Sequence, residues 1–310
     1  MKHVEQKRIS GFWRRLLALL TDVLLLGLVG FLLGSVLEDL LVEMGSWGRL
    51  VGFSVAVVYF GVMNSRVMNG GTIGKKLLKL EVVDGSGGPI GPGRSFARST
   101  VLLAPFFLNG AFPADYGVTP IVIYPLALIM FGGSLSIIYL YVFNRVSRQS
   151  LHDLIVGTYV VRAGVSGQET GKVWSPHLVV VLALCVASLA APALASALVK
   201  SEQLDDLMSM QQAVNSISSV SRATVASGTV THRSGNRKPE TRTYISVRAF
   251  VADRNPKDAD LARRLAEAVA ETYPDSRHKD AIEVTLTYGY DIGIWSRWYA
   301  YTHGFHPDKL

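Results

Sequence analysis

The chain has 310 residues, of which 49% are hydrophobic and only 18% are charged. This composition is too apolar for an ordinary water-soluble protein, so we expect a membrane protein. The formal net charge of +7 comes from cations that flank apolar stretches instead of forming one patch, which argues against a nucleic-acid partner. The single cysteine, Cys185, excludes a disulfide framework and a thiolate metal site.

Uncharged or nearly uncharged stretches of about 20 residues are long enough to cross the hydrocarbon core of a bilayer as helices. The third such stretch is short and contains two prolines, so it either crosses or enters and returns on the same side. We expect an α-helical polytopic membrane domain over residues 1–199. Its five predicted spans lie at about residues 16–37, 47–65, 99–114, 121–143 and 178–199.

Lysine and arginine gather in three segments beside these spans: before residue 16, between residues 65 and 99, and between residues 143 and 178. The positive-inside rule places such segments in the cytoplasm. With five spans the amino terminus is then cytoplasmic and the region after residue 199 is extracytoplasmic. We expect a multi-pass protein of the cell (inner) membrane with a periplasmic domain. If the third stretch does not cross, the side of that domain changes.

Residues 200–310 have the composition of a soluble domain. Alternating apolar and polar residues predict strands at about 222–232, 244–251 and 282–288. Between the second and third strands, a helix is expected to begin near Asn255 and to stop at Pro274. The sequence therefore predicts a small extracytoplasmic α+β domain with the order β-β-α-β.

Two further features lie at the ends of this domain. Apolar residues at helical spacing between Leu204 and Val214 predict a short amphipathic stalk. Near the carboxyl end, an aromatic cluster can form a ligand surface, a subunit contact or a membrane-interface belt, but we expect an ordinary aromatic core. The cluster comprises Trp295, Trp298, Tyr299, Tyr301 and Phe305.

The tail contains no set of residues typical of a catalytic or metal site. His303 and His306 are spaced for one helix face, but no third ligand is near them in the sequence, so we expect no metal site. No nucleophile, base and acid occur together in a recognisable pattern either, so we expect neither an enzyme nor a bound cofactor.

Asp22 lies inside the first predicted span. An acid at that depth costs roughly 2.5–3.5 kcal/mol, so it must face the bundle or a watery cavity and find a partner. Arg15 is on the same helix face but about 10 Å away along the axis. We therefore expect Arg98, Arg148 or His152 to partner at least one of the two. Asp22 is then either a packing clamp or an ion or proton site.

The glycine-rich segment after the second span contains a glycine followed by a lysine, as phosphate-binding loops do. The P-loop pattern fails, because Asn69 and Lys76 stand where it needs glycine and serine or threonine. We interpret the segment as an amphipathic stretch on the membrane surface, followed by a strand at LEVVDG. Lys75, Lys76 and Lys79 are then expected to face anionic lipid headgroups.

Three stretches of the chain resemble the motifs of the RDD family of membrane proteins, in the family's order and over about residues 10–162. They are GFWRRLLALLTD, GGTIGKKLLKLEVVDGSGGPIGPGRSFAR and RQSLHDLIVGTYVV. By matching position, the arginine and two aspartates that name the family are Arg15, Asp22 and Asp153. The remaining motif positions are Gly71, Thr72, Gly74, Lys75, His152, Gly157 and Thr158.

This resemblance implies transport, including the cation/proton antiport proposed for some family members. A pair between Arg15 and Asp153 would leave Asp22 deeper and free to bind a cation or proton. We expect a transporter or ion-handling membrane protein. The alternative is a non-transporting scaffold or sensor, in which these residues only hold the bundle together. In either case the carboxyl-terminal domain can bind a protein partner, a ligand or a second copy.

Overall fold

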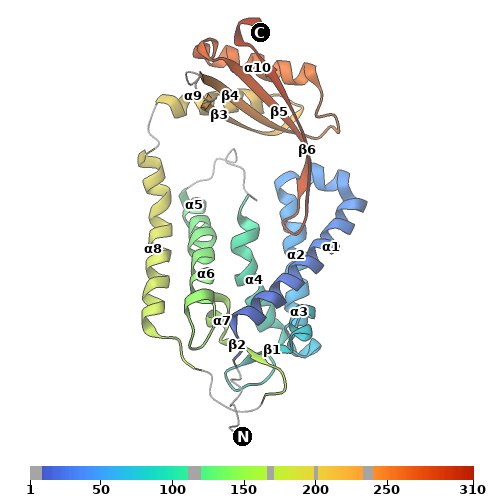
Figure 1. The fold of residues 1–310 in the computed structure, drawn as a ribbon, viewed down its shortest axis with the longest axis vertical. Helices are drawn as coiled ribbons and strands as arrows, with labels where there is room; N and C mark the ends of the chain where they lie inside the picture. Colours follow the sequence, from blue (N-terminus) through green and yellow to red (C-terminus); the bar gives the residue numbers. More distant parts are fainter. Residues whose placement is uncertain (1–8, 111–119, 166–170, 199–201, 233–239) are drawn as a thin grey trace. The chain divides into compact units, whose positions relative to one another are not determined.

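The computed structural model describes residues 9–110, 120–165, 171–198, 202–232 and 240–310 (Figure 1). The chain forms two compact units. The first contains residues 1–36, 46–195 and 292–295, and the second contains residues 37–45, 196–291 and 296–310. The composition change near residue 200 marks one boundary between them. Residues 37–45 belong to the second unit although they lie in the amino-terminal half, and residues 292–295 belong to the first unit although they lie near the carboxyl end. No change in composition marks these two short segments.

The first unit is built from long apolar helices. Those with a membrane-like composition are α1 (Phe12–Met44), α2 (Gly48–Met63), α5 (Pro120–Ala127), the π-helical segment η4 (Leu128–Gly133), α6 (Ser134–Phe143) and α8 (Ser175–Leu198). Three stretches of the described residues are long and apolar enough to cross a membrane: Phe12–Met63, Ile121–Phe143 and Ser175–Ala195. The first contains two helices, because the chain turns through η1 (Gly45–Trp47) between α1 and α2.

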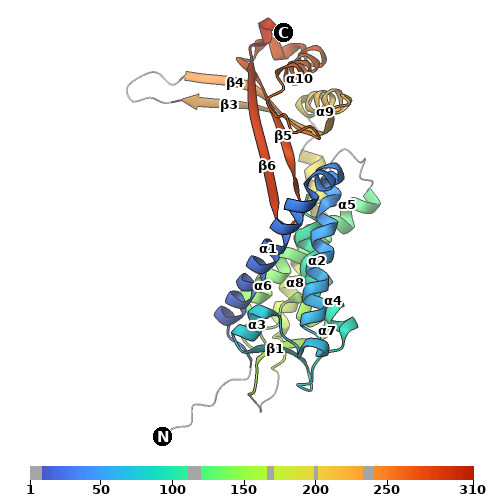
Figure 2. The ribbon, with the colours of Figure 1, turned by 90° about the vertical axis from the view of Figure 1, so that its right-hand side faces the viewer.

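Helix α4 (Pro92–Leu108) completes the helical layer, in which α2, α4, α6 and α8 run alongside one another (Figures 1 and 2). Its limits differ from the predicted third span. The helix begins seven residues before Ser99, at Pro92. Proline suits the first position of a helix, because a backbone N–H at that position has no partner within the helix. Arg98 is therefore a buried helical residue instead of a loop residue. Residues 111–114 of the predicted span lie outside the described residues.

Short elements gather at one end of the first unit. They are η2 (Arg66–Met68), α3 (Ile73–Leu77), β1 (Leu80–Asp84), α7 (Leu151–Val156) and β2 (Thr158–Arg162). β1 is the strand predicted at LEVVDG, and it pairs antiparallel with β2 so that Val82 lies opposite Val160. Both valines pack in a small core with Ala18 of α1. This core holds α3 and α7 beside the start of α1.

The turn between residues 292 and 295 is part of the first unit. Gly293 has a φ of +78°, and an added Cβ there would lie 2.6 Å from the Phe107 ring. A Cβ on Gly52 of α2 would lie only 1.8 Å from the Ile292 carbonyl oxygen. Trp295 packs its ring at 5.4 Å from that of Phe31. The turn thus fits closely against α1, α2 and α4, and glycine is required on both sides of the contact.

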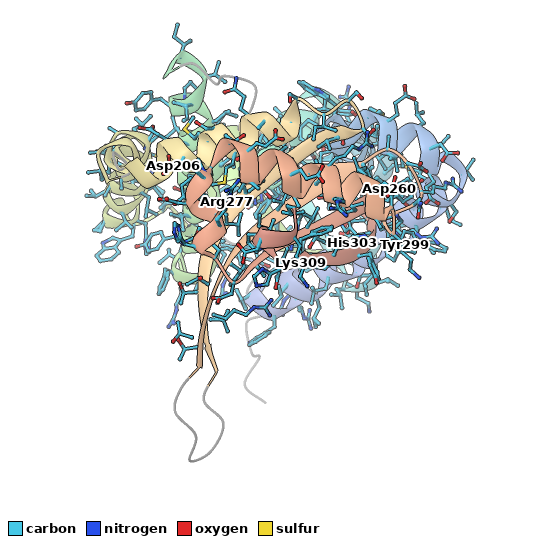
Figure 3. The ribbon with its side chains drawn as sticks, turned by 90° about the horizontal axis from the view of Figure 1, so that it is seen from above. Asp206, Asp260, Arg277, Tyr299, His303 and Lys309 are labelled. Carbon is cyan, nitrogen blue, oxygen red and sulfur yellow. The ribbon has the colours of Figure 1, made fainter. Side chains whose placement is uncertain are left out.

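The second unit is a four-stranded sheet with two helices. Its elements are α9 (Glu202–Asn215), β3 (Val220–His232), β4 (Glu240–Val251), α10 (Ala259–Thr272), η5 (Pro274–His278), β5 (Ala281–Asp291), β6 (Ser296–Phe305) and η6 (Pro307–Lys309). The strand order is β3-β4-β5-β6. Only β4 and β5 are parallel, because α10 connects them. Both helices cover one face of the sheet (Figure 3).

Both predicted helices of this unit are present, with changes at their ends. Asp258 is the N-cap of α10 and accepts a hydrogen bond from the Leu261 amide, so Asn255 is not the cap. The amphipathic segment predicted as a stalk is α9, but its Met210 and Val214 are buried in the core of the sheet. Part of the apolar face that predicted a stalk therefore packs inside the domain, whereas Met208 is exposed.

The aromatic segment forms a fourth strand, so the predicted order β-β-α-β lacks β6. The expectation of an aromatic core was wrong as well. Trp298, Tyr299 and Tyr301 are 43–45% exposed, because β6 is the edge strand and α10 covers its neighbours. Figure 3 shows Tyr299 and His303 beside α10 instead of beneath it.

Candidate functional site

A cavity of about 260 Å³ lies in the first unit among α1, α2, α3, α4, α6 and α7. Most of its wall is apolar, but six polar or charged residues line it too. The lining residues are Phe12, Arg15, Leu16, Leu19, Asp22, Phe60, Lys75, Arg98, Leu102, Phe106, Ile137, Ile138, Tyr141, Val142 and His152.

Asp153 binds two arginines beside this cavity and is fully buried. The Arg15 guanidinium donates to Oδ2 at 3.0 Å. The Arg98 guanidinium donates twice to Oδ1, at 2.9 and 2.7 Å. Thr158 Oγ1 donates to the same oxygen at 3.0 Å. One carboxylate therefore joins α1, α4, α7 and β2, and it includes the pair with Arg15 that the family motifs led us to expect.

Local sequence explains why Asp153 stands at this point. Ser150 is the N-cap of α7 and Asp153 the third helical residue, so the two form a capping box. Gly157 ends the helix with a φ of +66°, a conformation that glycine adopts without strain. A Cβ there would also lie 2.9 Å from the Arg94 guanidinium, which donates to the Gly157 carbonyl at 2.8 Å. The last RDD-like motif thus fixes the turn from α7 to β2.

His152 is neutral, whereas the neighbouring Asp153 is charged. Burial lowers the pKa of His152 to about 3, so its ring is neutral at pH 7. Burial alone would raise the pKa of Asp153, but Arg98 and Arg15 hold it below its ordinary value. The His152 Nε2 atom lies 3.5 Å from Asp153 Oδ2, which favours the proton on Nε2. Nδ1 is then a buried hydrogen-bond acceptor, for which the described residues supply no donor.

Asp22 is bound by neutral groups only, in the hydrogen bonds that the structure describes. Tyr59 Oη donates to Oδ1 at 2.7 Å, and the Gly74 amide donates to the same oxygen at 2.8 Å. Thr72 Oγ1 donates to Oδ2 at 2.6 Å. The side chain is 1% exposed. Asp22 therefore fastens α2 and the start of α3 to α1.

This geometry distinguishes among the expected partners of Arg15 and Asp22. Arg148 partners Arg15, whose guanidinium donates to the Arg148 carbonyl, whereas Arg98 and His152 lie beside Asp153, and none of the three donates to Asp22 among the described hydrogen bonds. Nor is the Asp22 carboxylate free, since both of its oxygens accept hydrogen bonds. The central motif supplies two of these donors, which the sequence did not reveal because α3 folds back onto α1.

Gly74 permits the fold-back of α3. A Cβ at this position would lie 2.1 Å from the Ala18 carbonyl oxygen of α1 and 3.0 Å from Asp22. Only glycine lets the backbone amide come within hydrogen-bond distance of the carboxylate. At the neighbouring motif position, a Cβ on Gly71 would lie 3.1 Å from the Leu80 carbonyl oxygen. The motif glycines thus mark close backbone contacts and not a phosphate site.

Lys75 points into the protein and does not face lipid headgroups, contrary to the prediction. Its ammonium donates to Asn64 Oδ1 at 2.6 Å and lies 6.0 Å from the Phe60 ring centre. Burial, together with the positive charge of Arg98, lowers the pKa of Lys75 to about 7. Lys76 and Lys79 are exposed. Asn64 and Tyr59 are the site residues that sequence reasoning missed, because each is one polar residue at the end of an apolar helix.

Among the described residues, no three His, Cys, Asp or Glu side chains are grouped as metal ligands. No curated protein and no solved structure matches the chain. A family model does match: that of the RDD family, over residues 9–157. The match covers Arg15, Asp22, Asp153 and the central motif. It ends at Gly157, directly after α7. Residues 9–157 are therefore an RDD-family domain, and the length and composition of the apolar helices indicate a membrane protein.

Proposed function

We propose that the RDD domain handles ions, exchanging a proton on Lys75 for a cation at Asp22. The observation that carries this proposal is a buried carboxylate at the cavity wall whose described hydrogen-bond donors are all neutral. An acid inside a membrane domain needs a positive charge nearby. Asp153 has two arginines for this purpose, whereas Asp22 has the lysine that shares its cavity.

The exchange follows from the charge on Lys75. While the lysine is protonated, its ammonium offsets the charge of Asp22. When Lys75 releases its proton to water, the Asp22 charge is left uncompensated and attracts a cation. Oxygen atoms suited to a hard cation are present on Asp22, Thr72 and Asn64. Proton and cation thus compete for one negative charge, which is the requirement for exchange.

Transport also requires an orientation in the membrane. We propose five crossings with the amino terminus in the cytoplasm and residues 200–310 outside, because lysine and arginine gather between alternate spans. A Cys185→Ser background with single cysteines at Lys79 and Arg248 tests this arrangement in sealed vesicles. An impermeant thiol reagent should label the two positions from opposite sides. Labelling of both from the same side contradicts the five-span topology.

Flux measurements test the exchange itself. The full chain in sealed proteoliposomes with an internal pH dye should move protons when Na⁺ or K⁺ is added outside. Asp22→Asn keeps the side-chain shape but removes the charge, so proton movement should fall to the level of empty vesicles. Glu81→Gln, a similar change on β1, should retain wild-type flux. If wild-type vesicles show no cation-dependent proton movement, the proposal is wrong.

A second candidate is a scaffold or sensor without transport, and the exposed aromatic residues of β6 favour it. Tyr299 and Tyr301 lie on one face of β6 and Trp298 on the other, and all three are exposed at the edge of the sheet, as aromatic residues of protein-binding surfaces often are. Neither candidate requires catalysis, and we propose that the protein is not an enzyme. A partner that co-purifies with the full chain, and is lost from a Tyr299→Ala, Tyr301→Ala variant, would support this role.

A further inference from the structure

Strand β6 is an edge of the sheet in the second unit, and its outer side is unpaired among the described residues. β5 is its only neighbour in the strand order. The strand spans ten residues and pairs with β5 without a register shift. No described backbone group bonds to its outer side. Every second residue there presents an N–H and a C=O group, so the edge is long and regular enough to accept one more strand.

β6 lacks the features by which natural proteins protect a free edge, which are lysine, proline, inward-facing charges and β-bulges. From Trp298 to Phe305 the sequence is WYAYTHGF, which contains no proline, acid, lysine or arginine. Arg297, the one arginine of the strand, is paired with Glu38 at 3.3 Å. The opposite edge differs, because β3 has a register shift at its start. The outer side of β6 is therefore suited to pairing with another strand.

Gly304 indicates what kind of strand fits beside β6. Glycine weakens the interior of a strand, so it usually marks a close approach. The fold of the unit supplies no such approach, because an added Cβ at Gly304 would have nothing within 4 Å and the residue has no left-handed φ. Gly304 and Trp298 lie on the face of the sheet that α9 and α10 leave open. A large ring on an added strand would cover this glycine, as aromatic residues across from edge glycines do.

We propose that β6 pairs antiparallel with β6 of a second copy, about a two-fold axis at Tyr301. Trp298 of each copy then lies opposite Gly304 of the other and covers it. On the other face, where Tyr299 and His303 lie beside α10 (Figure 3), Tyr299 of each copy lies opposite His303 of the other. With the axis on a residue, every side chain stays on its own face of the joint sheet. Aromatic pairs of this kind stabilise antiparallel strands, and each pair occurs twice.

Charge and anchoring both favour a second copy as the occupant. In this register Arg297 lies opposite Phe305 of the other copy, so the two arginines stand at opposite ends of the strand pair. One strand pair is at the low end of specific interface sizes. The apolar helices hold both copies in one membrane, which raises their effective concentration for each other. An extended segment of a soluble protein lacks this advantage. The proposal rests on the binding surface proposed above for β6, and it is independent of ion exchange.

Disulfide formation between copies tests the register, with the full chain in proteoliposomes. In a Cys185→Ser background, Tyr301→Cys places two thiols opposite each other at the axis. Opposite Cα atoms of antiparallel strands lie about 4.5–5.5 Å apart, within the range of a disulfide. The thiols of Tyr299→Cys would stand about 13 Å apart along the strands. Mild oxidation should therefore link Tyr301→Cys at least ten-fold more than Tyr299→Cys. Equal yields for the two variants overturn the proposal.

Gly304→Thr separates the contact between copies from the fold of one copy. The new side chain meets no atom of its own copy, so thermal unfolding should be unchanged. It blocks Trp298 of the other copy, so the dimer should dissociate at least ten-fold more readily. Energy transfer between donor- and acceptor-labelled copies in proteoliposomes, at decreasing protein-to-lipid ratio, measures this change. Ala226→Thr is the matched control, because Ala226 lies in the same row of the sheet as Gly304, on the opposite edge strand.

The control should dimerise like the wild type. Wild-type affinity in Gly304→Thr overturns the proposal, and so does a wild-type chain that shows no energy transfer at any protein-to-lipid ratio. If an unrelated protein co-purifies with a monomeric chain and is lost from the Tyr299→Ala, Tyr301→Ala variant, the second copy is wrong but the binding surface on β6 stands.

Discussion

The two buried aspartates of the RDD domain are stabilised by different kinds of hydrogen-bond donor. Asp153 is held by two guanidinium groups, from Arg15 and Arg98, and its charge is balanced where it lies. Asp22 is held by a tyrosine, a threonine and a backbone amide. The first arrangement leaves no negative charge available to a ligand. The second supplies hydrogen bonds to both carboxylate oxygens but no cation among the described hydrogen-bond donors.

This difference separates two roles within one motif family. Removing a partner from a paired, buried ion cluster leaves charges stranded, so the cluster around Asp153 resists change. Neutral donors impose a smaller penalty, because each contributes about the strength of an ordinary hydrogen bond. We therefore assign Asp153 mainly to the fold and Asp22 mainly to function. Four predictions test that division, beginning with the largest effect.

Asp153→Asn should destabilise the RDD domain by about 3–5 kcal/mol, because Arg15 and Arg98 lose a shared counter-charge while they remain buried. Unfolding by denaturant in detergent, followed by circular dichroism, measures the change. Glu81→Gln should stay within about 0.5 kcal/mol of wild type. A loss under about 1 kcal/mol for Asp153→Asn would show that the ion cluster does not anchor the helices.

Asp22→Asn should cost less, about 1–3 kcal/mol in the same measurement. The NH₂ group of asparagine replaces one carboxylate oxygen and cannot accept a hydrogen bond, so at least one of the three donors is left without an acceptor. The variant should still fold, which separates its effect on flux from misfolding. A loss equal to that of Asp153→Asn would remove the distinction between the two carboxylates.

The stability of the domain should rise between pH 7 and pH 9 through Lys75. The unfolded lysine keeps its proton up to its ordinary pKa of 10.5, whereas the folded one loses it near pH 7. Because the unfolded state binds more protons in this window, stability rises with pH, by at most about 1.4 kcal/mol per unit. Lys75→Met should flatten this slope, and Lys79→Met should leave it unchanged.

Tyr59→Phe should produce the smallest effect, about 1 kcal/mol. The change removes one of the donors to Asp22, and it also removes the hydroxyl that accepts a hydrogen bond from the Ile73 amide at 3.2 Å. Tyr159→Phe on β2, outside the cavity lining, serves as the matched control. If Tyr59→Phe abolished folding, Asp22 would belong with the structural cluster.

The sequence predicted site residues and secondary structure correctly at positions where the residue type has one clear physical reason. An acid in an apolar helix identified Asp22, and motif order led to the pairing of Arg15 with Asp153. Alternating residues predicted three strands of the second unit, and Pro274 marked the end of α10. These features depend on neighbours in the chain or on a charge that must be balanced.

Features set by distant contacts could not be predicted in this way. Nothing near Asp22 in sequence shows that Thr72 and Gly74 fold back to bind it. Lys75 looked like a surface cation because its neighbours Lys76 and Lys79 are exposed. The aromatic residues of β6 looked like core residues because their exposure depends on strand order in the sheet, which one strand's composition does not determine.

The turn at residues 292–295 sets a limit on how this protein can be divided for expression or for building chimaeras. A cut after residue 199 would remove four residues that belong to the first compact unit. It would leave Gly52 and Phe107 facing a gap that the Ile292 carbonyl and Gly293 normally fill. An RDD domain produced alone would therefore need these residues supplied as a separate peptide or a grafted loop, and any loop grafted there must keep glycine at its second position.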